Sequence, residues 1–149
     1  MKHVIDESEM HERYKSEIFD VMENEPYARF LGIKLVKISE GKAVAKLNVK
    51  DYMLNSHGTV HGAIIFAIAD YVFASACNSY GKTAVGLSTT INYMKAGKKG
   101  SCLQATAIEE KKNHKLGWYK VEIESDEGLI ATMEAVAYRK SQYFVPTED

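Results

Sequence analysis

Apolar and polar residues alternate with two different periods along this chain. Over residues 6–24, apolar side chains recur at helical spacing among charged ones, namely Tyr14, Ile18, Val21 and Met22. Pro26 follows closely, so we expect one amphipathic N-terminal helix that stops before the proline. Residues 33–38 and 42–49 predict two strands joined by a turn at Glu40-Gly41, because apolar and polar positions alternate in the second segment.

The most apolar stretch, residues 60–78, is apolar on every side and therefore predicts a buried helix, which Gly81 would close. Four strand-like segments follow, at residues 83–94, 101–110, 116–125 and 129–138. One antiparallel sheet wrapped around the buried helix would accommodate two strands before the helix and four after it. The pattern thus predicts an α+β fold in a single domain, residues 1–149, with its core over about residues 28–140.

Charge and composition narrow the possible partners and locations. The net charge is −1 and no long Lys/Arg run is present, which argues against nucleic acid as the main partner. The apolar stretch is shorter than the roughly 20 residues that span a bilayer, and residues 1–12 lack the apolar core of a secretion signal. We therefore expect a cytoplasmic protein without a membrane partner. Cys77 and Cys102 have neither metal-ligand nor CxxC spacing, so we interpret both as reduced packing residues and predict no metal site.

Asp70 is the most informative residue for chemistry. It lies inside the predicted buried helix, among apolar neighbours that offer no opposite charge. Burying an ionised carboxylate costs several kcal/mol unless something compensates it. The alternatives are a catalytic acid and a structural one that caps a neighbouring strand or pairs with a cation from elsewhere.

The start of the same helix carries a second signal. Residues 55–62 contain Asn55, His57, Gly58, His61 and Gly62, just where the backbone N–H groups of a helix lack partners. Such donors can hold a developing oxyanion, and a glycine lets a substrate carbonyl approach the backbone. The alternative is that Thr59 caps the helix and occupies the Gly62 N–H.

The run from Asn55 through His61-Gly62 to Asp70 resembles the hotdog-fold acyl-CoA thioesterases, in particular their PaaI-like, phenylacetate-pathway branch. The resemblance extends from Ala28 to the last predicted strand. It implies that Asp70 is the nucleophile or general base, that the Gly62 N–H holds the thioester oxygen, and that Asn55 and His61 shape the site.

Further residues of the matching segment are expected to bind substrate. Thr90 and Asn92 fall within Thr90-Ile-Asn-Tyr-Met-Lys95, and Lys95, Lys98 and Lys99 would form a rim for the CoA phosphates. A solvated, lysine-rich turn is the alternative for the three lysines. Two positions depart from the family: Ala63 replaces a frequent second glycine, which would narrow the acyl pocket, and Lys95-Ala96 replaces a common Arg-Pro.

Spacing also predicts self-association. Gly62 and Asp70 are eight residues apart, which is about 12 Å along a helix at about 1.5 Å per residue. A reacting carbonyl must lie about 3 Å from both groups. We therefore expect composite sites, each with Gly62 from one copy and Asp70 from another, in a homodimer. The resemblance implies that dimers pair further into homotetramers.

The expected activity is hydrolysis of an acyl-CoA to the free acid and CoA, with no cofactor beyond the CoA of the substrate. Phe66, Phe73 and Tyr93 favour a small apolar acyl group such as (hydroxy)phenylacetyl, although such residues also fit an ordinary core. Two alternatives stay open: a hotdog enoyl-CoA hydratase and a non-catalytic acyl-CoA-binding module.

Overall fold

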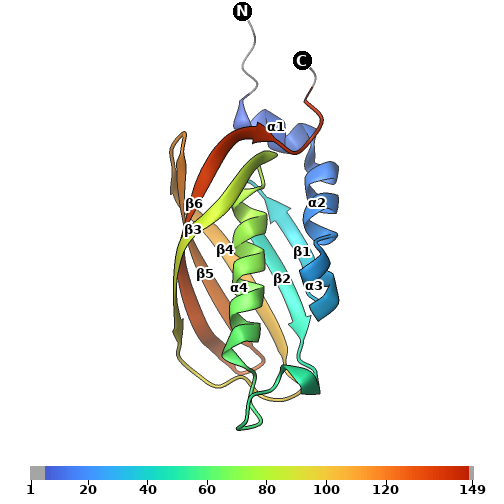
Figure 1. The fold of residues 1–149 in the computed structure, drawn as a ribbon, viewed down its shortest axis with the longest axis vertical. Helices are drawn as coiled ribbons and strands as arrows, with labels where there is room; N and C mark the ends of the chain where they lie inside the picture. The colour runs from blue at the N-terminus through green and yellow to red at the C-terminus, as the bar shows by residue number, and fades with distance from the viewer. Residues whose placement is uncertain (1–5, 148–149) are drawn as a thin grey trace, which may run out of the picture.

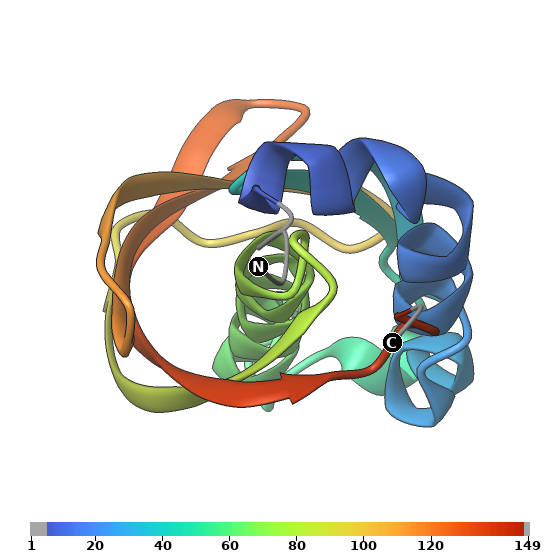
Figure 2. The same cartoon turned by 90° about the horizontal axis from the view of Figure 1, so that it is seen from above.

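The computed structural model describes residues 6–147, in which six antiparallel strands curve around one long helix (Figures 1 and 2). The strand order across the sheet is β1-β2-β4-β5-β6-β3. The strands are β1 (Lys34–Ser39), β2 (Lys42–Asn48), β3 (Lys82–Tyr93), β4 (Cys102–Lys112), β5 (Leu116–Ser125) and β6 (Gly128–Tyr143). The predicted α+β class and the hotdog arrangement, with two strands before the helix and four after it, are confirmed.

The alternation along β5 explains why the sheet has one buried face. Tyr119, Val121 and Ile123 are at most 2% exposed, whereas Lys120 and Glu122 between them reach solvent. On β6 the inward positions include Ala131, Ala135 and Ala137, whose small side chains let a helix approach closely. That helix is α4 (Gly62–Cys77), which lies in the concavity of the sheet (Figure 2).

The helix α4 ends earlier than predicted. It stops at Cys77, and Asn78 caps it and then ties it to the start of β3. The Asn78 Nδ2 donates to the Ala84 carbonyl oxygen over 3.0 Å, while the Ala84 N–H donates to the Asn78 Oδ1 over 2.9 Å. The prediction that Gly81 closes the helix is wrong: Gly81 lies in the following turn, with φ +76°.

The helix is also not buried on every side. Ala63 and Asp70 are exposed, and Phe66 and Ala74 are half-buried, so an open stripe runs along α4 at spacings of three and four residues. The sheet covers most of the remaining surface of the helix, and the N-terminal helices contact it near Tyr71. The expectation of a fully buried helix is therefore wrong for this stripe in the single chain.

The predicted N-terminal helix is divided into α1 (Glu7–Arg13) and α2 (Lys15–Glu23), which meet at Tyr14. A helix that was not predicted, α3 (Pro26–Leu31), follows, because Pro26 begins this helix rather than only ending the previous one. A short 3₁₀ turn, η1 (Asp51–Met53), precedes the loop that leads into α4. None of the helices within residues 6–147 has both the length and the apolarity needed to cross a lipid bilayer.

Both cysteines are free, as predicted. Cys77 is buried in the core, and this burial raises the pKa of its thiol to about 12. Cys102 is half-buried at the start of β4. The buried thiol therefore stays protonated at neutral pH.

Candidate active site

Asp70 lies in the middle of the open stripe of α4, on a cavity of about 560 Å³. Most of the lining is apolar or aromatic: Tyr27, Ala28, Ile33, Ala63, Phe66, Ala67, Tyr71, Ala74 and Tyr93. The carboxylate is exposed to this cavity, so the expectation of a buried acid is wrong for the single chain. Partial burial among these groups nevertheless raises the pKa of Asp70. No hydrogen bond or ion pair joins its carboxylate to any other residue in the range 6–147, so no structural partner is found there.

Glu25 is the other acid that lines this cavity, and sequence reasoning missed it. It stands between α2 and α3, directly before Pro26. Its pKa is raised, first by burial and second by the negative charge of Asp70. In the sequence, an acid before Pro26 looks like an ordinary helix cap, so no signal separated it from its charged neighbours.

The start of α4 leaves one backbone donor available. His61 is the N-cap residue, and its Nδ1 accepts a hydrogen bond of 2.9 Å from the Ala63 N–H. The Thr59 hydroxyl instead bonds with the Asn55 side chain, so the alternative in which Thr59 caps the helix is wrong. Within the described part of the chain, the Gly62 N–H has no acceptor and remains free for a ligand oxygen.

Asn55 organises the loop before α4. Its Oδ1 accepts the N–H groups of His57 and Thr59 at 3.0 and 3.1 Å, and its Nδ2 donates to the Thr59 Oγ1 over 2.9 Å. All these contacts stay within the loop. Asn55 therefore stabilises the conformation of the loop that leads into His61 and Gly62 at the start of α4.

Gly62 lies on a second cavity, of about 350 Å³, together with Asn55 and Lys95. Asp70 does not line this cavity, and His61 lines neither of the two. Tyr93 borders both: its hydroxyl donates a hydrogen bond of 3.3 Å to the Gly62 carbonyl oxygen. The two predicted catalytic groups therefore belong to separate cavities of one chain, on either side of Tyr93.

The predicted lysine rim is already occupied by acids. Lys98 Nζ lies 2.6 Å and Lys95 Nζ 3.7 Å from the carboxylate of Glu127, while Lys99 Nζ lies 3.4 Å from Asp51. The lysine side chains are at least 50% exposed, so each pair is worth little and can exchange for another anion.

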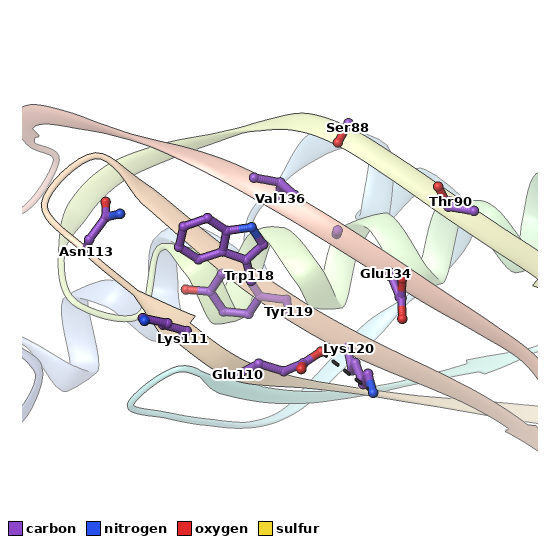
Figure 3. A pocket seen from close by; sticks show the side chains of 11 residues that line it. Ser88, Thr90, Glu110, Lys111, Asn113, Trp118, Tyr119, Lys120, Glu134 and Val136 are labelled. Atoms are coloured by element: carbon purple, nitrogen blue, oxygen red, sulfur yellow. Dashed lines mark ion pairs between the residues drawn. The ribbon is translucent and has the colours of Figure 1, made fainter.

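The predicted residues Thr90 and Asn92 lie away from these cavities. Thr90 lines a hollow of about 710 Å³ on the outer face of the sheet (Figure 3). Trp118 lines the same hollow, next to the buried Tyr119 on β5, and α4 lies behind the sheet in this view. Asn92 is exposed two residues further along β3. The structure therefore brings neither Thr90 nor Asn92 to Asp70 or Gly62 of the same chain.

The aromatic residues predicted for an acyl pocket are divided. Phe66 and Tyr93 line the cavity of Asp70. Phe73 is 1% exposed and packs edge-on against Tyr119, with 5.5 Å between ring centroids. Phe73 therefore belongs to the core, and the expectation that it faces the acyl group is wrong.

Known proteins share sequence similarity with this chain. The family model of the Thioesterase superfamily matches residues 57–132, which include Gly62 and Asp70. The acyl-coenzyme A thioesterase PaaI of Escherichia coli is 41% identical over 101 residues, covering 68% of this chain and 72% of that protein. A putative esterase of Archaeoglobus fulgidus is 36% identical over 94% of this chain and 90% of its own length.

Solved structures show the same fold. The structure of E. coli PaaI, from the phenylacetic acid degradation operon, superposes with a TM-score of 0.82 and 31% identity, covering 93% of this chain and 99% of that one. A hypothetical thioesterase from Streptococcus pneumoniae, solved with coenzyme A, gives a TM-score of 0.71 and 25% identity over 74% of this chain and 88% of its own. The chain therefore belongs to the thioesterase superfamily, as a PaaI-like enzyme with the hotdog fold.

Proposed function

We propose that this enzyme hydrolyses an acyl-CoA thioester to the free acid and CoA, with Asp70 acting at the reacting bond. The observation that carries the proposal is the Asp70 carboxylate, which has no partner among the described residues and lies on a largely apolar cavity that none of their cations lines. The activity named for the E. coli relative and the coenzyme A in the S. pneumoniae structure support the choice of thioester.

The chemistry follows from two groups. The Gly62 N–H, at the positive end of α4, donates to the thioester carbonyl oxygen and stabilises the oxyanion as it forms. Asp70 either attacks the carbonyl carbon, giving an anhydride that water then hydrolyses, or accepts a proton from attacking water. By either route the C–S bond breaks, CoA leaves as its thiolate, and water supplies the acid's new oxygen.

The acyl group belongs in the cavity of Asp70. Tyr27, Phe66 and Tyr93 give this cavity aromatic walls, and Ala63 and Ala67 leave room between them. These walls favour a small apolar or aromatic acyl group, with phenylacetyl and hydroxyphenylacetyl as the candidates to test first.

We propose that the CoA portion binds at the second cavity. Lys95 lines it near Gly62, whereas Lys98 and Lys99, further along the same turn, line a separate cavity of about 200 Å³. We propose that CoA phosphates displace Glu127 from Lys95 and Lys98, because exposed ion pairs exchange readily. The reaction needs only substrate, water and these side chains, so we propose no separate cofactor. The cytoplasmic location stays a prediction.

We further propose that two copies complete each site through β3. This edge strand carries no charged residue from Thr83 onward, and Val85 and Leu87 expose 41% and 58% of their surface. An apolar, uncharged edge of this length favours pairing with another strand. The opposite edge, β1, carries Lys34 and Lys37. Pairing of β3 with a second copy would form the predicted homodimer. Further pairing into a homotetramer stays a prediction.

The decisive experiment measures thiol release from phenylacetyl-, hydroxyphenylacetyl-, short- and long-chain acyl-CoA by the purified protein. Release with formation of the free acid supports the proposal, and loss of release in Asp70→Asn assigns the acid. Tight acyl-CoA binding without thiol release would instead indicate a binding module. Hydration of an enoyl-CoA with its thioester intact would indicate a hydratase.

A further inference from the structure

The position of Glu25 is fixed next to the helix that carries Asp70. The Tyr71 hydroxyl donates a hydrogen bond of 2.9 Å to the Met22 carbonyl oxygen, which holds the end of α2 against α4. Pro26 begins α3 immediately after Glu25. The acid is therefore held between two anchored segments, outside the residues 57–132 that match the superfamily model.

The usual structural roles of such an acid do not account for Glu25. An acid directly before a helix commonly accepts an N–H of the first turn, but the Glu25 side chain makes no capping hydrogen bond. Within residues 6–147, no cation pairs with it. The side chain is half-buried and lines the Asp70 cavity rather than extending fully into solvent.

The charge balance of this cavity is unusual. Among residues 6–147, its only charged lining residues are Glu25 and Asp70, and the other titratable groups that face it are the phenols of Tyr27, Tyr71 and Tyr93. The negative charge of Asp70 also helps to raise the pKa of the buried Cys77 thiol, for which burial is the main cause. Two like charges beside one largely apolar cavity disfavour each other, and such arrangements concentrate at functional sites.

We propose that Glu25 is an electrostatic positioning residue of the active site, whose negative charge makes Asp70 a stronger base and nucleophile. The inference rests on the proposed function and adds a residue to it, contributed by the N-terminal helices. A nearby negative charge destabilises an ionised carboxylate and makes it a stronger base. Such a carboxylate attacks a carbonyl carbon or accepts a proton from water more readily.

The test compares the pH dependence of kcat/KM for the wild type, Glu25→Gln, Glu25→Asp and the control Glu23→Gln. Glu23 lies exposed on α2, two residues away, and does not line the cavity. Glu25→Gln should move the acid limb to lower pH, because like charges disfavour each other, and should lower the plateau by about threefold. Glu25→Asp and Glu23→Gln should keep the wild-type profile. An unchanged profile in Glu25→Gln would overturn the inference.

A second measurement separates this inference from the proposed function. Carbon-13 NMR of the aspartate carboxyls, with Asp70→Asn to assign the signal, reports the Asp70 titration without any substrate. The apparent midpoint should fall in Glu25→Gln and stay unchanged in Glu23→Gln. If no acyl-CoA is hydrolysed, the proposed function fails while this titration still decides whether the two acids interact. Equal midpoints in the wild type and Glu25→Gln would refute that interaction.

Discussion

The Tyr93 hydroxyl is hydrogen-bonded to the Gly62 carbonyl oxygen over 3.3 Å, so the end of β3 is fastened to the first turn of α4. Tyr93 belongs to an edge strand, and its phenol bonds to the backbone of a glycine. It sets the space in which we propose that the thioester carbonyl meets the Gly62 N–H.

Gly62→Ala should therefore impair turnover without unfolding the protein. A Cβ at this position would lie 3.4 Å from the Tyr93 Cζ, an ordinary contact, and the φ of Gly62 lies outside the left-handed region. The new methyl would lie against the Tyr93 ring, beside the cavity that Gly62 lines, so kcat/KM should fall at least about tenfold. Thermal melts check the fold, and wild-type activity in this variant would contradict the proposed oxyanion site.

Asp70→Asn should remove activity and leave the fold at least as stable. Losing a general base or nucleophile should lower kcat by about 10² to 10⁴. Burial raises the pKa of Asp70, so its ionised form destabilises the folded state above that pKa, and the effect disappears below the unfolded value. The melting temperature should equal or exceed the wild type at pH 7 and match it near pH 3. A clearly lower Tm at pH 7 would indicate a structural acid.

Two substitutions at the lysine rim should change the KM for acyl-CoA in opposite directions. Lys98→Ala should raise KM for acyl-CoA about two- to fivefold, because one phosphate partner is lost. Glu127→Gln should lower the same KM, because it removes the carboxylate that competes for Lys95 and Lys98.

An acyl N-acetylcysteamine thioester, which lacks the CoA phosphates, provides the control substrate. Neither rim variant should change its KM. Lys34→Ala, on the exposed surface of β1, is the matched control enzyme. Equal effects on both substrates would place the phosphates elsewhere.

Self-association through β3 can be tested by a single substitution that introduces a charge into this strand. Leu87→Lys places a cation on the uncharged edge of β3 and should convert the assembly into monomers with little activity. Val36→Lys is the matched control, because Val36 is also exposed, at 50%, on the opposite edge strand. Sedimentation analysis of both variants decides, and an unchanged assembly in Leu87→Lys would exclude pairing through β3.

The N-terminal helices are anchored by an ion pair whose contribution depends on pH. Burial alone would raise the pKa of Glu7, but hydrogen bonds from Arg139 and Lys112 outweigh it and hold the pKa below its ordinary value. A lowered folded pKa stabilises the fold above the unfolded value of about 4.3 and loses that contribution as the pH falls through the folded pKa.

Glu7→Gln should therefore cost about 1 kcal/mol at pH 7, and the difference from the wild type should shrink below pH 4 or so. Urea melts at both pH values measure it. Glu9→Gln, an exposed acid in the same helix, should have little effect at either pH.

Most of the fold could be predicted from residue patterns, because burial on one side imposes a period. β5 matches its predicted bounds at Leu116 and Ser125. β6 was predicted to end at Tyr138, where a polar run begins, but it continues to Tyr143 because it pairs with the start of β3. Pairing with a distant strand leaves no local signal.

The site could be predicted only in part for a similar reason. Asp70 and Gly62 differ visibly from their surroundings in the sequence, one by charge and one by conformational freedom. Glu25 gave no such signal among the acids near it, and its role depends on where α2 and α3 pack. Lys95 and Lys98 were found, but their pairing with Glu127 follows only from the folded turn.

The chain enters and leaves the fold at one end of the molecule, where α1 and the last residues of β6 lie, while the loop before Gly62 lies at the opposite end (Figure 1). A tether, reporter domain or solid support attached beyond either terminus would thus stand far from the proposed entrance for CoA. The enzyme is therefore suited to immobilisation by its ends, since the loop before Gly62 faces away from the attachment point.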